Sequence, residues 1–165
     1  MARQLWLLRH AEAEPHGSRD EERRLTARGE RQARAAGIAL ARLGVRFEAI
    51  LTSPKSRARQ TAEIAAEEWG SEQRERVRIH PPLAGAFAAA QARDAAAEIA
   101  PDGRLLLVGH EPDFSGLVAD LTGGQVDVKK GGLAVVRLEG LGGELALLLR
   151  PRELALIAGL PAEGH

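Results

Sequence analysis

The chain has 165 residues, a length typical of one domain with one hydrophobic core, so we expect a single domain over residues 1–165. It carries 23 basic and 23 acidic residues, and this balance gives no overall charge that would attract nucleic acid or an anionic membrane. It contains no cysteine, which excludes disulfides and thiolate chemistry and is compatible with a cytoplasmic location. With three Phe and two Trp, stacked aromatic platforms for nucleic-acid bases are not expected.

The N-terminal segment predicts neither a signal peptide nor a membrane anchor. Its apolar run over residues 5–8 is shorter than the roughly 7–15 apolar residues of a signal peptide, and it continues directly into Arg9. No other stretch approaches the roughly 18 apolar residues of a membrane-spanning helix. We therefore expect no contact with a membrane.

The first predicted strand is the same run, residues 5–8, because a continuous apolar segment is typical of a strand buried on both faces of a parallel sheet. Residues 11–24 are polar and are expected to form a long loop. Thr26 is then predicted to cap an Ala- and Arg-rich helix that ends near Leu43, with Gly44 as its terminator. The inward face of this helix is predicted to consist of Ala33, Ala36, Gly37, Leu40 and Leu43.

The middle of the chain continues the alternation of strands and helices. A second strand is predicted over residues 47–52, followed by a helix with Ser53 as its N-cap, Pro54 at its first position and Gly70 at its end. The remaining predicted elements are strands over 77–79 and 104–108, helices over 88–99 and 112–123, an antiparallel pair over 133–138 and 145–149, and a short helix from Pro151.

This order of elements predicts an α/β fold, a three-layer sandwich with a mostly parallel central sheet of about six strands flanked by helices. The ligand site of such a fold lies beyond the carboxyl ends of the strands. His10, Ser53 and His110 each follow a predicted strand end. We therefore expect these three side chains to lie at one edge of the sheet.

Two histidines and two arginines at this edge suit a phosphoryl group. Arg9 and His10 end the first strand, Arg57 lies in the first turn of the second helix, and His110 follows the fourth strand. A phosphoryl dianion has three oxygens that forked guanidinium groups can bind, and a neutral imidazole can attack its phosphorus. Water would then hydrolyse the resulting phosphohistidine. Ser53 is expected to face the same pocket while capping the helix.

The segments that carry these residues resemble the successive signatures of the histidine phosphatase superfamily. They are Leu8-Arg9-His10-Ala11, Ser53-Pro54-Lys55-Ser56-Arg57-Ala58-Arg59-Gln60-Thr61 and Gly109-His110-Glu111-Pro112, and Leu25-Thr26-Ala27-Arg28-Gly29 resembles a helix-start signature of the same family. The short length and the Arg-His-Ala-Glu-Ala-Glu opening are most similar to the SixA-type phosphohistidine phosphatase branch. The resemblance implies a phosphoglycerate mutase-like fold. It also implies that His10 is the nucleophile and that Arg9, Arg57 and His110 bind and activate the phosphoryl group.

One expected position lacks the carboxylic acid that would protonate an alcohol leaving group. Larger relatives such as phosphoglycerate mutases and acid phosphatases carry this acid after the third strand or beside the second histidine, and here residues 82–86 read Pro-Leu-Ala-Gly-Ala. An alcohol leaves poorly without a proton, whereas an imidazole with a pKa of about 6.5 leaves once it is protonated. The carboxylates that could still substitute are Glu111, Asp113, Glu12 and Glu14.

These features predict a cytoplasmic phosphatase that hydrolyses protein phosphohistidine through His10 and needs no cofactor. Only one short helix fits between residues 83 and 104, so the cleft should be open enough for a phosphohistidine-bearing protein such as a phosphotransfer domain. One alternative is a small-molecule phosphomonoesterase that acts on phosphorylated metabolites. Another is a non-catalytic phosphate-binding module. Mutase activity is not favoured without the acid and without an enclosing cap.

Other charged residues are assigned to the surface. We predict that Lys55, Arg28 and Arg59 face solvent. Lys129 and Lys130 either prevent an edge strand from pairing with another chain or contact an acidic partner, and both alternatives stay open. A metal site is not expected, because the arginines beside the two histidines would repel a dication.

Overall fold

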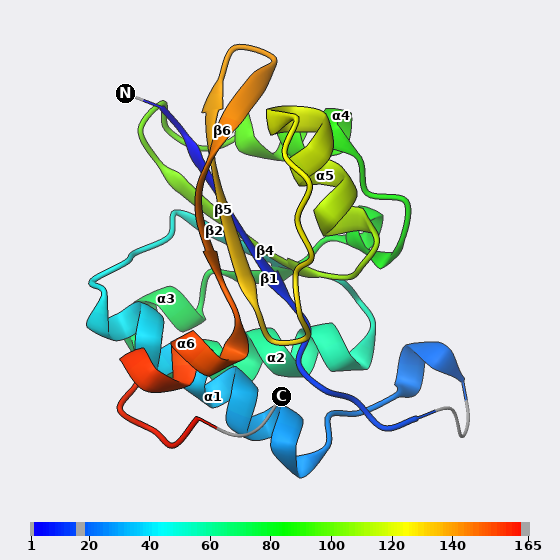
Figure 1. Ribbon diagram of the computed structural model, residues 1–165, viewed down its shortest axis with the longest axis vertical. Coiled ribbons are helices and arrows are strands. Elements are labelled where there is room, and N and C mark those ends of the chain that lie inside the picture. The colour runs from blue at the N-terminus through cyan, green and yellow to red at the C-terminus, as the bar shows by residue number, and fades with distance from the viewer. Residues whose placement is uncertain (1, 16–18, 163–165) are drawn as a thin grey trace.

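The computed structural model of the protein describes residues 2–15 and 19–162 (Figure 1). Its strands are β1 (Gln4–Arg9), β2 (Ala49–Thr52), β3 (Val77–Ile79), β4 (Arg104–Gly109), β5 (Leu133–Glu139) and β6 (Gly142–Leu149). Its α-helices are α1 (Ala27–Arg42), α2 (Ser56–Ala66), α3 (Gly70–Arg74), α4 (Ala89–Ala96), α5 (Asp113–Thr122) and α6 (Pro151–Ile157). Its 3-10 turns are η1 (Asp20–Glu22), η2 (Glu67–Trp69) and η3 (Pro81–Ala84).

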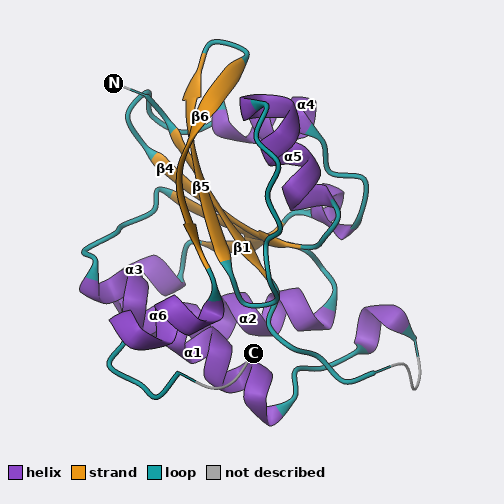
Figure 2. Ribbon diagram, viewed as in Figure 1, coloured by secondary structure: helices purple, strands orange, loops and turns teal. Residues whose placement is uncertain are grey.

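The strands of the described residues form one sheet in the order β3-β2-β4-β1-β5-β6. The first four of these strands run parallel, whereas β5 is antiparallel to both β1 and β6. Helices lie on both sides of the sheet, with α4 and α5 on one side and α1, α2 and α6 on the other (Figure 2). The predicted three-layer α/β fold is confirmed, and the sheet is mixed rather than wholly parallel.

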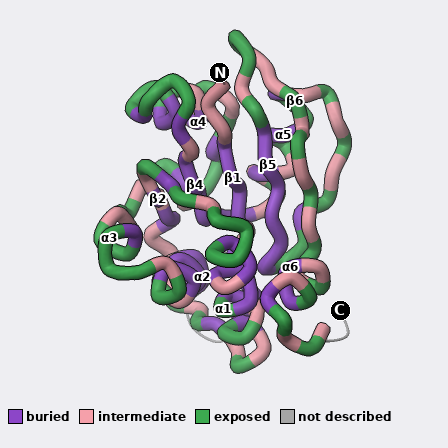
Figure 3. Tube along the Cα trace, turned by 90° about the vertical axis from the view of Figure 1, so that its left-hand side faces the viewer, coloured by how far each residue is buried: buried purple, intermediate pink, exposed green. Residues whose placement is uncertain are grey.

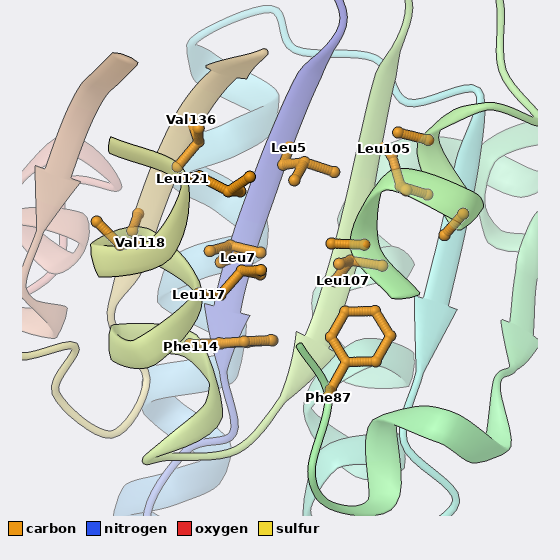
Figure 4. Packing of buried hydrophobic residues seen from close by; sticks show 14 of the residues in the cluster. Leu5, Leu7, Phe87, Leu105, Leu107, Phe114, Leu117, Val118, Leu121 and Val136 are labelled. Carbon is orange, nitrogen blue, oxygen red and sulfur yellow. The ribbon is translucent and has the colours of Figure 1, made fainter. Parts of the chain in front are cut away.

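Both faces of the central strands are buried, which explains their continuous apolar sequence. Leu5 and Leu7 of β1 pack under α4 and α5, where Phe114 and Leu117 cover them (Figure 4). The alternate residue Leu8 faces the α1, α2 and α6 layer. Figure 3 shows the central strands as a buried band inside a more exposed outer surface. Burial of each large apolar side chain stabilises the fold by about 1.5–3 kcal/mol.

The ends of α1 follow the local sequence. The hydroxyl of Thr26 accepts a hydrogen bond from the amide of Gly29 at 2.9 Å, and Gly44 follows the helix with φ of 70°. The inward face was predicted incorrectly at one position, since Leu43 is 48% exposed. It lies just past the last helical residue, where the chain turns away from the core, and Ala39 is buried instead.

The start of α2 also differs from the prediction. The helix begins at Ser56, with Lys55 at its N-cap, rather than at Ser53 and Pro54. Ser53 stays extended because its amide donates to the carbonyl of Val108 at 3.0 Å, which continues the pairing between β2 and β4. Gly70 does not end α2 either: the helix stops at residue 66, and Gly70 follows η2 with φ of 81°.

Gly29 lets α1 approach the loop that follows β1. A Cβ atom at this position would lie 1.9 Å from the carbonyl oxygen of Glu12, a distance that requires the backbone to shift. We predict that Gly29→Ala lowers the free energy of unfolding by about 1–3 kcal/mol in urea titrations. Gly116→Ala in α5 is the matched control, because a Cβ there meets nothing within 4 Å. Equal stability of the two variants would contradict this explanation.

Candidate active site

The two histidines leave the sheet side by side because β1 and β4 pair in parallel. Arg9 lies opposite Gly109 in the register, and the amide of His10 donates to the carbonyl of Gly109 at 2.9 Å. His10 and His110 therefore follow adjacent strand ends, with ring centroids 5.2 Å apart and exposures of 6% and 7%. The predicted meeting of these residues at one edge of the sheet is confirmed.

The backbone determines which nitrogen of His10 carries the proton. Nδ1 lies 2.7 Å from the carbonyl oxygen of Ala11, which can only accept a hydrogen bond. Nδ1–H of the neutral ring is therefore the donor, and the lone pair remains on Nε2. The following amide, that of Ala11, donates to Thr61 Oγ1 at 3.0 Å and so ties this loop to α2.

Ser53 connects His110 to the start of α2. Nε2 of His110 lies 2.8 Å from the Ser53 hydroxyl, and the same hydroxyl accepts the amide of Lys55 at 3.2 Å. The hydroxyl still has its own proton and a second lone pair, so it can either donate to Nε2 of His110 or accept from Nε2–H. The sequence predicted that Ser53 faces the phosphate pocket and also caps the second helix. It lies beside His110 as expected, although it precedes the helix rather than capping it.

In each of the two arginines, one guanidinium nitrogen donates a hydrogen bond to a backbone carbonyl. Arg9 Nη1 donates to the carbonyl of Val128 at 2.9 Å, and Arg57 Nη1 donates to the carbonyl of Asp20 at 2.8 Å. Arg57 is only 6% exposed, although it is a charged residue in the first turn of a helix. Long-range contacts from two separate loops therefore orient both groups.

Three buried polar side-chain atoms have no hydrogen-bond partner among the described residues, and all three belong to this cluster. They are Arg9 Nε, Arg57 Nε and His110 Nδ1. Buried polar atoms in folded proteins are almost always paired, because an unpaired one loses its contact with water and gains nothing in return. The cluster thus contains unused hydrogen-bonding capacity beside two positive charges, which is what an anion would complete.

Burial keeps both imidazoles neutral. The pKa of His10 is lowered to about 3, mainly by desolvation; the Ala11 hydrogen bond opposes this change, and smaller effects of His110, Arg57 and Arg9 add to it. Desolvation also lowers the pKa of His110 to about 4, with further contributions from Arg57 and Lys55. Both rings are therefore neutral at neutral pH, and each has one N–H group and one unprotonated nitrogen.

Two residues that contact Arg57 were not predicted from the sequence. Thr61 belongs to the motif quoted above but had no assigned role, and its hydroxyl donates to the carbonyl of Arg57 at 2.7 Å. Asp20 had no sequence signal beyond its place in an acidic loop segment, yet its carboxylate lies 3.3 Å from Arg57 Nη2. Lys55 was predicted to face solvent, but its side chain is 22% exposed and lies 3.2 Å from the Asp20 carboxylate.

The other surface assignments have mixed outcomes. The Arg59 side chain is 43% exposed, as predicted, and pairs with Glu63, whereas that of Arg28 is 31% exposed and lies 3.7 Å from the Glu12 carboxylate. Lys129 and Lys130 are exposed, and Lys129 pairs with Asp127.

Most of the candidate leaving-group acids are held in other hydrogen bonds. Glu111 accepts the amide of Ser115 at 2.7 Å, Asp113 accepts the amide of Phe87 at 3.1 Å, and Glu12 accepts the hydroxyl of Thr26 at 3.0 Å. Glu14 is exposed.

Across residues 2–15 and 19–162, no group of three or more acidic or histidine side chains could hold a metal ion, and no helix has the length and apolarity to cross a membrane.

Comparison with known proteins identifies the family. Residues 5–105 match the histidine phosphatase superfamily (branch 1). The chain belongs to this superfamily. An uncharacterized protein of Picosynechococcus sp. is 39% identical over 142 residues, which cover 81% of this chain and 84% of that protein. The serine/threonine-protein phosphatase PGAM5 of Rattus norvegicus is 40% identical over 62 residues, which are 38% of this chain and only 22% of that protein.

Solved structures place the fold within the same superfamily. The protein histidine phosphatase SixA complexed with tungstate matches with a TM-score of 0.81 and 25% identity, covering 92% of this chain and 99% of that one. The resemblance to the SixA type is thereby confirmed. An alpha-ribazole phosphatase from Shigella flexneri has the same fold, with a TM-score of 0.66 and 22% identity, covering 90% and 96% of the two chains. Phosphoserine phosphatase of Entamoeba histolytica also shares it, at 15% identity.

The buried imidazoles of this histidine phosphatase should make its stability depend on pH. His10 has a lower pKa in the folded chain than the roughly 6.5 of an unfolded one, so the unfolded state binds more protons between these values and stability falls as the pH drops. We predict that His10→Gln reduces the loss of unfolding free energy between pH 7.5 and pH 5 by about 1–2 kcal/mol. Urea titrations at both pH values measure this difference. An identical loss in wild type and His10→Gln would refute the interpretation.

Proposed function

We propose that this histidine phosphatase hydrolyses phosphohistidine on proteins by transferring the phosphoryl group to Nε2 of His10. The observation that supports this best is the set of three buried, unpartnered polar atoms around that ring. A phosphoryl group has enough oxygens to accept hydrogen bonds from Arg9, Arg57 and His110 together. It would also neutralise the two adjacent guanidinium charges.

In the first step, the lone pair of His10 Nε2 forms a bond to phosphorus while the bond from phosphorus to the substrate nitrogen breaks. The Ala11 carbonyl holds Nδ1–H, so the ring is in the correct tautomer before the substrate binds and the positive charge that develops is stabilised there. The departing imidazole leaves as a neutral ring once its other nitrogen is protonated. In the second step, water attacks phosphorus, inorganic phosphate leaves and neutral His10 is regenerated.

The other residues have distinct proposed roles. Arg9 and Arg57 bind the peripheral phosphoryl oxygens through their free Nε groups and stabilise the charge of the transition state. In this proposal the Ser53 hydroxyl donates a hydrogen bond to Nε2 of His110, so the ring proton lies on the unpartnered Nδ1 and can be donated to a third oxygen. Neutral His110 can therefore bind the phosphoryl group without raising the charge of the site.

The leaving group is inferred from the carboxylates. η3 and the two residues after it, Gly85 and Ala86, offer none, and Glu111, Asp113 and Glu12 already accept other hydrogen bonds. A phosphoramidate needs a positioned acid less than an ester does, because imidazole is the better leaving group. Only one α-helix, α4, lies between η3 and β4, so this segment has no extra helices that could enclose a small substrate. Both features favour a phosphorylated protein, such as a phosphotransfer domain in the cytoplasm.

A small-molecule phosphomonoesterase is the second candidate. The alpha-ribazole and phosphoserine phosphatases share this fold, so the scaffold accommodates other leaving groups. The acid in that case would be one of Glu111, Asp113, Glu12 and Glu14, of which Glu14 is exposed. A non-catalytic phosphate-binding module is the third reading. The single domain, the absence of a cofactor and the lack of nucleic-acid or membrane partners stay predictions.

Replacement of the nucleophile tests the mechanism. We predict that His10→Ala lowers phosphate release from a phosphohistidine protein by at least about 10³-fold, because the covalent step has no other nucleophile. Wild-type protein quenched during turnover should carry an acid-labile phosphate that the variant lacks. The control His80→Ala should keep wild-type activity. Retained turnover in His10→Ala would exclude the covalent mechanism, and a wild-type protein without turnover would favour the binding module.

A substrate panel tests the leaving group. We predict that kcat/KM for a phosphohistidine protein exceeds that for phosphoserine and sugar phosphates by at least about 10²-fold, the usual contribution of the general acid that only an ester requires. Initial phosphate release at pH 7.5 with matched substrate concentrations measures these ratios. Faster hydrolysis of the esters would instead support the phosphomonoesterase, and Glu14→Gln would then reduce it only if Glu14 is the acid.

A further inference from the structure

Lys55 and Asp20 form an ion pair beside Arg57 of the candidate active site. Lys55 lies two residues after Ser53 and two before Arg57, at the N-cap of α2. Its ammonium group is 3.2 Å from the Asp20 carboxylate, and its side chain is 22% exposed. Asp20 belongs to the η1 turn, which Figure 1 shows in blue beside the helix layer that contains α2. The contact thus joins a loop after β1 to the helix start that carries the site.

Three cations contact the Asp20 carboxylate. Its Oδ2 lies 3.2 Å from Lys55 and 3.3 Å from Arg57 Nη2, and its Oδ1 lies 3.2 Å from Arg23. Desolvation favours the protonated acid, but the hydrogen bonds from Lys55 and Arg23 and the charge of Arg57 outweigh it and lower the pKa of Asp20 far below its usual range. Asp20 is therefore an anion at every pH at which the protein would work.

Two of the three cations belong to the phosphoryl site, and the third does not. Lys55 and Arg57 come from the start of α2, and both charges act on His110. Arg23 follows the η1 turn itself, three residues after Asp20, so their ion pair can persist wherever the turn lies. An arriving anion could replace the carboxylate at Lys55 and Arg57 while Asp20 keeps Arg23. A phosphoryl dianion would bind these two cations more strongly than one carboxylate, because it offers more oxygens and more charge.

We propose that Lys55 is a further phosphoryl-binding residue and that Asp20 is an internal anion that the phosphorylated substrate displaces from Lys55 and Arg57. In the unliganded protein, the carboxylate keeps both cations ordered and limits their repulsion. The same carboxylate competes with the incoming anion and so weakens its binding. The identity of that anion rests on the proposed function, whereas the exchange itself concerns only anion binding.

Inorganic phosphate is the probe that tests the exchange. Isothermal titration of the full chain at pH 7.5 and fixed salt should give roughly fivefold weaker phosphate binding for Lys55→Met, the change expected for loss of one partly exposed ion pair. Asp20→Asn should tighten binding by a similar factor, because a competing charge is removed. Arg59→Met is the matched control on the same helix, since its side chain is 43% exposed and pairs with Glu63. Arg57→Gln should abolish measurable binding and so locate the bound phosphate.

Tighter or weaker phosphate binding by Asp20→Asn shows whether Asp20 competes with phosphate or only positions Arg57. If Asp20 only clamps Arg57 in place, the variant binds phosphate more weakly than wild type, and this result or an unchanged affinity overturns the proposal. An unchanged affinity in Lys55→Met overturns it as well. Circular dichroism and thermal melts of each variant separate these outcomes from misfolding. Because the readout is equilibrium binding, the result is independent of the substrate panel and of the His10→Ala assay, which test the proposed function.

Discussion

The parallel pairing of β1 with β4 is the interaction on which both the fold and the site depend. In this register Arg9 lies opposite Gly109, so His10 and His110 leave the sheet together. A slip of one residue would turn each side chain of β1 toward the opposite core and move His10 along the sheet relative to His110. The contacts that stabilise the sheet therefore also fix the separation of the two imidazoles. The positions of the two imidazoles are therefore set by the buried strands that precede them.

The second constraint is that the site is buried and positively charged. Burial of polar groups is unfavourable unless they are paired, and this cluster pairs only some of them. The carbonyls of Val128 and Asp20 orient the two guanidiniums, while the Nε atoms of both stay unpartnered. Unpaired buried donors are unfavourable, so a bound anion that accepted hydrogen bonds from these atoms would stabilise the folded protein. The depressed pKa values of the two histidines have the same cause, because an uncharged ring is the form that a buried, cationic site tolerates.

Local chemistry predicted most of the elements, and tertiary contacts changed some of their ends. The Thr26 cap was predicted correctly because a hydroxyl three residues before an amide acts within one turn. The start of α2 was not, because Ser53 is held extended by a hydrogen bond to β4, a strand that lies far away in the chain. Leu43 was assigned to the core by helical periodicity alone. That periodicity ends with the helix, and the side chain is exposed.

The sequence by itself determined which strands are buried, the α/β order of elements and the side chains that meet at the strand ends. It could do so because apolar runs and the residues that follow them are local features. Only the tertiary structure decided that Asp20 reaches Arg57, 37 residues further along, and that Lys55 turns toward the site rather than toward solvent. The path of the loop after β1 creates these contacts, and no local pattern encodes that path. The ion pairs form because the fold brings their charges together.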